Sequence, residues 1–241
     1  MSPYDCGSYA SSTTYVTGMA VMKASTELRE RITRRGAKML QCTQEEVEFN
    51  GASVVCLKTG AQVTLKELAN ASLCANDEAL EVTAAHYSPT SPPPFMVGMA
   101  EVEVDMETGK VTPVDYVAVV DCGTVINPSL ARVQTEGGIA QGIGMALYED
   151  VVYNAKGKDL SNSFMQYRIP TRLDVGEIRV DFESSYEPSG PFGAKSIGEI
   201  VINTPSPAIA SAISHATGGH FRELPITPEK VYCAMQKEKA Q

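Results

Sequence analysis

The sequence contains no tryptophan and only three histidines, and none of its six cysteines forms a Cys-x-x-Cys pair. No cysteine–histidine cluster has the spacing of a zinc site, so a structural zinc domain is excluded. The cysteines lie far apart, and a chain of 241 residues does not need disulfides to be stable. We therefore expect buried, reduced thiols.

Long hydrophobic runs are also missing. No apolar stretch approaches the roughly 20 residues that a membrane-spanning helix needs. The first residues, MSPYDCGSYA, have neither the basic nor the apolar region of a signal peptide. These absences predict a cytoplasmic protein that does not enter a membrane.

Basic residues are fewer than acidic ones, 20 against 29, which gives a formal net charge of −9. An acidic surface disfavours binding to nucleic acids and to anionic membranes. Hydrophobic residues make up 43% of the chain and charged residues 20%, which is ordinary for a globular protein. The length allows one large domain or two small lobes.

The first part of the chain predicts a long helix over Gly18–Leu40, where apolar residues recur at helical spacing. Two short strands follow around Asn50-Gly51, a favoured hairpin turn. Thr64, with Glu67 three residues later, forms the capping box of another helix. The proline-rich segment SPTSPPP interrupts any helix or central strand, and we expect a lobe boundary near residues 88–95.

The second part predicts a β-hairpin, a helix, a strand and a further helix. Two alternating apolar segments flank the turn Glu107–Lys110. A helix opens at Asn127-Pro128 and runs to about Glu149, and EIRVDFES is a strand. AIASAISHATG is a helix that ends at Gly218. The fold class is therefore α+β, with mixed or antiparallel sheets, packed helices and two lobes within one domain over 1–241.

Three glycine-rich segments, 7–14, 137–144 and 190–199, are typical of turns or helix starts that bind anions, and equally of plain turns. Glycines inside the predicted helix need a reason, and close approach of another backbone or of a ligand is one. Gln141 in that helix is either a ligand contact or a solvated polar residue. Glu199 lies among apolar neighbours in SIGEIVIN, which would raise its pKa and suit a general base. The alternative for Glu199 is a first-turn glutamate stabilised by the helix dipole.

Five motifs follow one another along nearly the whole chain: DCGSYASSTTYVTGMAV, VVDCGTVINPSLARVQTEGGIAQGIGMALYED, FMQYRIPT, GPFGAKSIGE and ATGGHFRELPITPEKV. In this order they resemble one family, the molybdenum hydroxylases of the xanthine dehydrogenase and aldehyde oxidase type. The resemblance implies the C-terminal part of a molybdopterin-binding subunit. It implies hydroxylation of an aromatic heterocycle, of purine or nicotinate type, or oxidation of an aldehyde, with oxygen derived from water.

The resemblance also implies roles for single residues. Glu199 would be the catalytic base, and a molybdopterin, of the cytosine dinucleotide form, would be bound by the residues Tyr9, Ala10, Ser11, Thr13 and Gln141. The cofactor's dithiolene holds the metal, so no protein ligand to molybdenum is expected. The chain has no cluster cysteines and no flavin loop, so iron–sulfur clusters and FAD are expected on partner chains, beside a larger molybdopterin-binding subunit.

The chain departs from the family pattern in three ways. It is much shorter than a whole molybdenum subunit, so it is either a natural small subunit of a split enzyme or a fragment. Ser12 stands where many relatives have arginine, which would weaken a phosphate or partner contact. Cys6 replaces a common threonine. The alternative function is a non-catalytic remnant or interaction module that keeps the fold without the cofactor.

Overall fold

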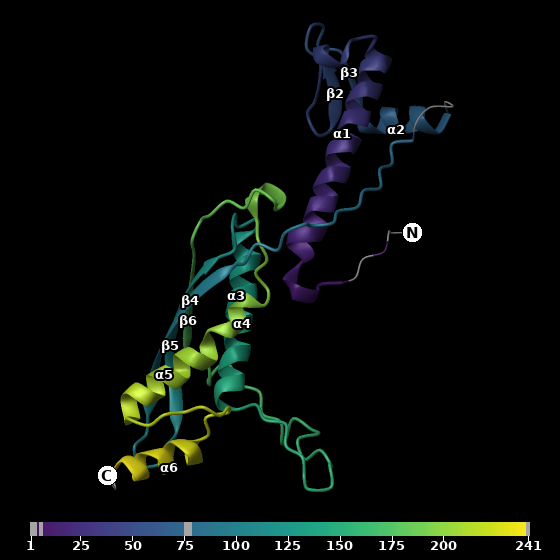
Figure 1. Ribbon diagram of the computed structural model, residues 1–241. Coiled ribbons are helices and arrows are strands. Elements are labelled where there is room, and N and C mark those ends of the chain that lie inside the picture. The colour runs from purple at the N-terminus through teal and green to yellow at the C-terminus, as the bar shows by residue number, and fades with distance from the viewer. Residues whose placement is uncertain (1–3, 5–6, 75–78, 240–241) are drawn as a thin grey trace. The chain divides into compact units, whose positions relative to one another are not determined.

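The computed structural model describes residues 4, 7–74 and 79–239, and the chain divides into two compact units (Figure 1). Unit 1 comprises Met1–Gly7 and Thr13–Pro89, and unit 2 comprises Ser8–Ser12 and Thr90–Gln241. No helix in the described ranges is both long enough and apolar enough to cross a membrane. The predicted α+β class, with packed helices and small sheets, is confirmed.

Unit 1 is a long helix packed on a three-stranded antiparallel sheet of order β1-β2-β3. Its elements are the π-helical turn η2 (Thr13–Thr17), α1 (Gly18–Leu40), η3 (Gln44–Glu46), β1 (Val47–Phe49), β2 (Ser53–Cys56), β3 (Gln62–Thr64) and α2 (Leu65–Cys74). A Cβ on Gly36 would lie 2.5 Å from the Cβ of Val54, so α1 lies directly against β2. The predicted first helix is confirmed over its whole length, whereas the third strand was not predicted.

Local sequence signals shape unit 1. Asn50 Oδ1 accepts hydrogen bonds from the N–H groups of Ala52 and Ser53, which closes the predicted turn between β1 and β2. The backbone N–H of Thr64 donates to Glu67, and the N–H of Glu67 donates back to Thr64 Oγ1. The capping box predicted at the start of α2 is thus confirmed.

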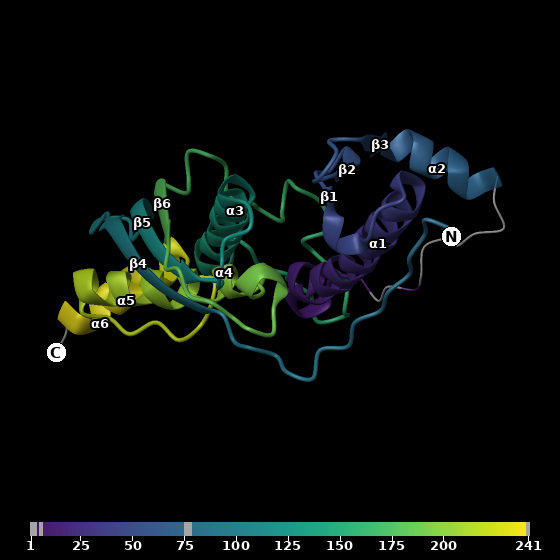
Figure 2. The same cartoon turned by 90° about the horizontal axis from the view of Figure 1, so that it is seen from above.

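Unit 2 is a three-stranded sheet covered by helices, as Figures 1 and 2 show. Its elements are η1 (Tyr9–Ser11), β4 (Phe95–Val104), β5 (Val111–Asp121), α3 (Pro128–Leu147), β6 (Glu177–Phe182), η4 (Pro191–Gly193), α4 (Ile200–Asn203), α5 (Pro205–Thr217) and α6 (Pro228–Lys239). Strand β5 pairs antiparallel with β4 and parallel with β6. Helix α5 lies along β4, α3 lies along β6, and the two helices also contact each other.

The predicted elements of this unit are confirmed, but α6 was not predicted. The Asn127 side chain accepts a hydrogen bond from Leu130 N–H at 3.1 Å and so caps α3. A signal for α6 was present, because Thr227 and Pro228 stand where a helix-capping residue and a first-turn proline are favoured.

The core of unit 2 fills the space between the sheet and the helices. Tyr116 is 2% exposed and donates from its hydroxyl to Thr204 Oγ1 at 2.9 Å. The opposite face of the sheet is open and apolar: Phe95, Val97 and Met99 of β4 are 60%, 67% and 61% exposed. Apolar side chains on an uncovered sheet face are typical of a surface that another part of a protein covers.

Four cysteines whose side chains are described are free thiols. Cys56 and Cys122 are buried, as expected, and Cys42 is half-buried. Cys233 is exposed, so the expectation of burial is wrong for this residue. Cys6 lies outside the described residues.

Candidate functional site

Ser8–Ser12, the first segment of unit 2, forms a strained turn. Ala10 and Ser11 have φ of 50° and 55°, values that favour glycine, and Ser12 then returns to φ −80°, ψ −6°. The change from a left-handed residue, Ser11, to a right-handed one, Ser12, is the backbone pattern of a concave nest that binds anions, and the Ser12 N–H itself donates to the Tyr9 carbonyl at 3.2 Å. Backbone strain of this kind persists where the surroundings require it, and it concentrates at binding sites.

The loop Gly190–Glu199 is strained as well, and it reaches the same turn. Phe192 and Gly193 have φ of 53° and 89°. A Cβ on Gly198 would lie 2.9 Å from Ser11 Oγ and 3.9 Å from Gln134 Nε2 of α3. The fold therefore brings together the first segment of unit 2, Gln134 in the first half of α3, and the residue that precedes Glu199.

Glu199 lies at the N-terminus of the short helix α4 and is exposed. It makes no side-chain capping hydrogen bond, and no partner for its carboxylate is found among the described residues. The argument that apolar neighbours surround this carboxylate is wrong for this chain taken by itself. Glu199 is instead exposed, and it directly follows Gly198, which lies against Ser11.

Helix α3 uses its glycines mainly for packing. A Cβ on Gly138 would lie 2.2 Å from Val201 Cγ2 of α4, and one on Gly142 would lie 2.7 Å from Pro205 Cγ of α5. Gly144 leaves room for the Glu149 carboxylate, 2.0 Å from where its Cβ would lie. Close approach of other segments is therefore the reason for three of the four glycines.

Gly137 differs, since nothing lies within 4 Å of the position its Cβ would take. It shares an exposed face of α3 with Gln134 and Gln141, which stand three residues before and four residues after it. Gln134 lies beside Gly198, and Gln141 lies about 10.5 Å further along the helix axis. Two amide side chains and an open glycine thus line a surface that starts at the strained turn.

The predicted cofactor-binding residues lie in three places. Ser11 contacts the loop that precedes Glu199, and Tyr9 and Ala10 belong to the same turn; Gln141 lies on the α3 face that begins at Gln134. Thr13 is exposed and begins the second segment of unit 1. Gln134 was not predicted. Its one signal was a position seven residues before Gln141, two helical turns away on the same face.

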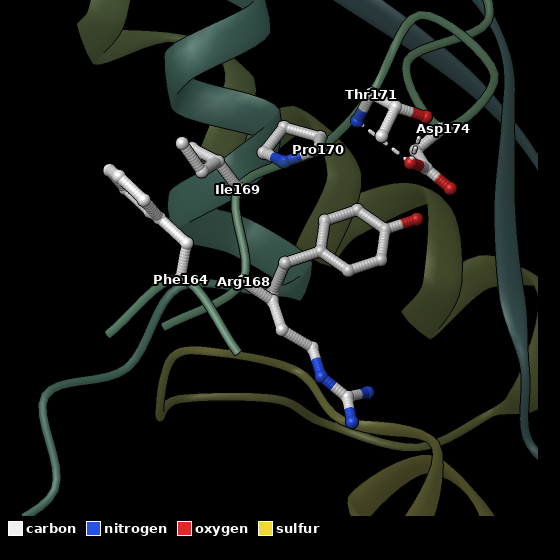
Figure 3. Close-up of a pocket in the computed structure, with 7 residues that line it drawn as sticks. Phe164, Arg168, Ile169, Pro170, Thr171 and Asp174 are labelled. Carbon is white, nitrogen blue, oxygen red and sulfur yellow. Dashed lines mark hydrogen bonds between the residues drawn. The ribbon is translucent and has the colours of Figure 1, made fainter. Parts of the chain in front are cut away.

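A hollow in unit 2, away from this surface, has a volume of about 550 Å³ and is drawn in Figure 3. It is lined by Tyr148, Phe164, Arg168, Ile169, Pro170, Thr171 and Asp174. Asp174 accepts hydrogen bonds from the N–H and the hydroxyl of Thr171, at 2.7 and 2.6 Å, which fixes one wall (Figure 3). None of the predicted site residues lines this hollow.

Comparison with known proteins identifies the family to which the chain belongs. Residues 1–176 match the family described as the molybdopterin cofactor-binding domain. The chain belongs to the molybdenum hydroxylase family. This confirms the resemblance found in the five sequence motifs, and it makes molybdopterin the cofactor for which the strained turn and the α3 face should be tested.

Individual relatives agree with the family. The chain is 37% identical to the probable hypoxanthine oxidase XdhD of Escherichia coli K12, over 97% of the chain and 25% of that relative. It is 33% identical to the 6-hydroxypseudooxynicotine dehydrogenase complex subunit gamma of Paenarthrobacter nicotinovorans, over 97% of the chain and 31% of the relative. The crystal structure of quinoline 2-oxidoreductase from Pseudomonas putida 86 matches with a TM-score of 0.86 and 30% identity, over 97% of the chain and 31% of that structure. The chain therefore spans between a quarter and a third of these relatives.

Proposed function

We propose that this chain forms one wall of the active site of a molybdenum hydroxylase that oxidises a nitrogen heterocycle or an aldehyde with oxygen derived from water. The observation that carries the proposal is the meeting of Ser11, Gly198 and Gln134 next to Glu199. The names of hypoxanthine oxidase and quinoline 2-oxidoreductase favour a heterocyclic substrate.

The residues present suit a molybdopterin. A phosphate-bearing pterin needs hydrogen-bond donors and room, and the turn at Tyr9, Ala10 and Ser11 leads into Ser12 with the backbone pattern of an anion-binding nest. Gln141 offers an amide beside the open position at Gly137, and the hydroxyl of Thr13 follows the turn in sequence. We expect the cytosine dinucleotide form. When bound, the cofactor supplies the redox chemistry and the activated oxygen.

Glu199 then acts as the general base. Its carboxylate has no hydrogen-bond partner among the described residues, so it is free to accept a proton at either oxygen. A base is effective when its pKa lies near the working pH, which for a carboxylate requires removal from water. We expect the remainder of the enzyme to provide that burial, because this chain leaves Glu199 exposed.

Apolar surfaces that the chain leaves exposed indicate where partners bind. Apolar side chains are exposed on the open face of β4, and Leu130 and Val133 of α3 are 67% and 66% exposed. Relatives are three to four times longer than this chain. We propose that the remaining portion of a molybdopterin-binding subunit covers these faces, and that iron–sulfur and flavin partner chains carry the electrons away, in the cytoplasm.

Replacement of Glu199 by glutamine tests the function. Glu199→Gln keeps the size of the side chain and removes its basicity, so turnover per molybdenum in the assembled enzyme should fall at least about a hundredfold. Molybdenum content should stay near that of the wild type.

A matched control is Glu229→Gln, because Glu229 is an exposed first-turn glutamate of α6. That change should cost only about 0.3–1 kcal/mol of stability and leave turnover intact. A Glu199→Gln enzyme with full cofactor and near-normal turnover would remove Glu199 from the mechanism. Absence of molybdenum from the assembled wild-type protein would favour a non-catalytic remnant that keeps the fold.

A further inference from the structure

A nearly buried ion pair joins the end of β5 to the Gly190–Glu199 loop. Lys195 Nζ is 2.7 Å from Asp121 Oδ2, and the two side chains are 10% and 19% exposed. The ammonium also lies 5.5 Å from the centre of the Phe95 ring, on the neighbouring strand β4. A lysine placed among a carboxylate and an aromatic ring has little freedom to move.

Asp121 is fully engaged by its neighbours. Its Oδ1 accepts hydrogen bonds from the Gly123 N–H at 2.9 Å and from Ser185 Oγ at 2.5 Å. Burial opposes the charged form, yet the hydrogen bonds from Lys195, Ser185 and Gly123 hold the pKa of Asp121 below its ordinary value. The carboxylate therefore stays ionised, and its ion pair with Lys195 persists at neutral pH. Loss of Lys195 would leave a buried charge without its counter-ion.

The backbone around Lys195 is fixed to the same end of β5. The Lys195 N–H donates to the Cys122 carbonyl at 2.8 Å, and the Thr124 N–H donates to the Gly193 carbonyl at 2.8 Å. Gly123 has φ 69°, and a Cβ there would lie 2.3 Å from the Gly193 oxygen, so the two segments are in close contact. The loop is thus anchored up to Lys195, and only three residues separate that anchor from Glu199.

We propose that Lys195 and Asp121 are positioning residues: their ion pair fixes the Gly190–Glu199 loop on the rigid end of β5, so that Gly198 stays against Ser11 and Glu199 stays in place for proton transfer. The role in proton transfer rests on the proposed function of Glu199. The anchoring of the loop does not, since it follows from contacts within unit 2. Displacement of a catalytic group by about 1 Å can cost about a hundredfold in rate, which is why such an anchor matters.

Strand β5 supplies a control ion pair nearer its middle, six residues before Asp121. Asp115 accepts hydrogen bonds from Arg179 of β6, one of them from Nε at 3.2 Å, and the Arg179 side chain is 59% exposed. This pair joins β5 to β6 in the same sheet, and among the described residues its hydrogen bonds and ion pair are within the pair and not with the Gly190–Glu199 loop. A general loss of stability in the sheet should therefore appear in both variants, whereas displacement of the loop should appear in only one.

The experiment compares Lys195→Met, Lys195→Arg and Arg179→Met. Amide hydrogen exchange in the full chain reports on residues 196–203, and kcat and KM per molybdenum are measured in the assembled enzyme. Lys195→Met should speed exchange in 196–203 at least about tenfold and lower kcat about tenfold to a hundredfold, with KM changed less than about threefold. Lys195→Arg keeps the charge and should restore a substantial part of the wild-type exchange rate and kcat. Arg179→Met should change neither the exchange rate in 196–203 nor kcat.

The outcomes separate the two proposals. The anchoring role would be overturned if residues 196–203 exchanged in Lys195→Met at the wild-type rate. It would also be overturned if Arg179→Met sped exchange in these residues as much as Lys195→Met does. Faster exchange in Lys195→Met together with normal turnover in Glu199→Gln would leave the anchor standing and reject the proposed function. If Lys195→Met does not fold, Asp121→Asn applies the same test while keeping the shape of the carboxylate side chain.

Discussion

Helix α3 has two faces, and the same residue type serves a different purpose on each. On the packed face, Gly138 and Gly142 let α4 and α5 approach, with Val201 and Pro205 filling the space a side chain would take. On the open face, Gly137 stands between two exposed amides with nothing within 4 Å. Glycine on the first face is explained by contacts within this chain, whereas no contact within the chain explains Gly137 on the second. The open face is therefore the one on which the proposed cofactor contact of Gln141 should be tested.

The largest effect on stability is expected on the packed face. In Gly138→Ala the new Cβ would meet Val201 Cγ2 at 2.2 Å, so α4 must move or the helix must distort. Overpacking of this kind costs about 1–3 kcal/mol and outweighs the roughly 1 kcal/mol that alanine gains over glycine in a helix. Denaturant unfolding of the chain measures the difference. Wild-type stability in this variant would mean that the two faces do not differ.

An intermediate effect, on cofactor content, is expected from Gln141→Ala. Gln141 is exposed, so its loss should leave the fold unchanged. If its amide holds the cofactor, molybdenum content should fall several-fold, because a lost hydrogen bond to a partly charged group costs about 1.5–3 kcal/mol. Turnover per molybdenum should be preserved. Unchanged molybdenum content with collapsed turnover per molybdenum would place Gln141 in the chemical step instead.

The smallest effect on stability is expected from Gly137→Ala. Since the new Cβ meets nothing, the chain should gain up to about 1 kcal/mol from helix propensity. In the assembled enzyme the same methyl group would stand where the cofactor approaches, so molybdenum content should fall. A variant that is more stable and loads molybdenum normally would show that the open glycine has no role in binding.

Local sequence signals predicted most of the elements, because they act over a few residues. The Thr64–Glu67 capping box, the Asn50-Gly51 turn and the Asn127 cap all form as the sequence indicates. The third strand, β3, is only three residues long, and its pairing with β2 is a tertiary contact that periodicity does not reveal. Helix α6 had a start signal at Pro228 that was not used.

The site was predicted less completely, because its geometry joins distant segments. No local pattern places Ser11 against Gly198, since the two lie near opposite ends of the chain. The apolar residues around Glu199 in sequence do not enclose its carboxylate, because α4 is short and directs Val201 into the core instead. Gln134 carries no motif of its own and is found only through its contact with the loop.

The central claim is that this chain is one wall of a molybdopterin site and needs the rest of the enzyme to complete it. A measurement of molybdenum content tests this claim most directly. The chain should be purified by itself and together with the remaining portion of its molybdenum-binding subunit, and the metal should be counted per chain. We predict no molybdenum in the chain alone, whose apolar faces on β4 and α3 are uncovered, and about one atom per chain in the assembly. Stoichiometric molybdenum in the chain alone, or none in the assembly, would contradict the account.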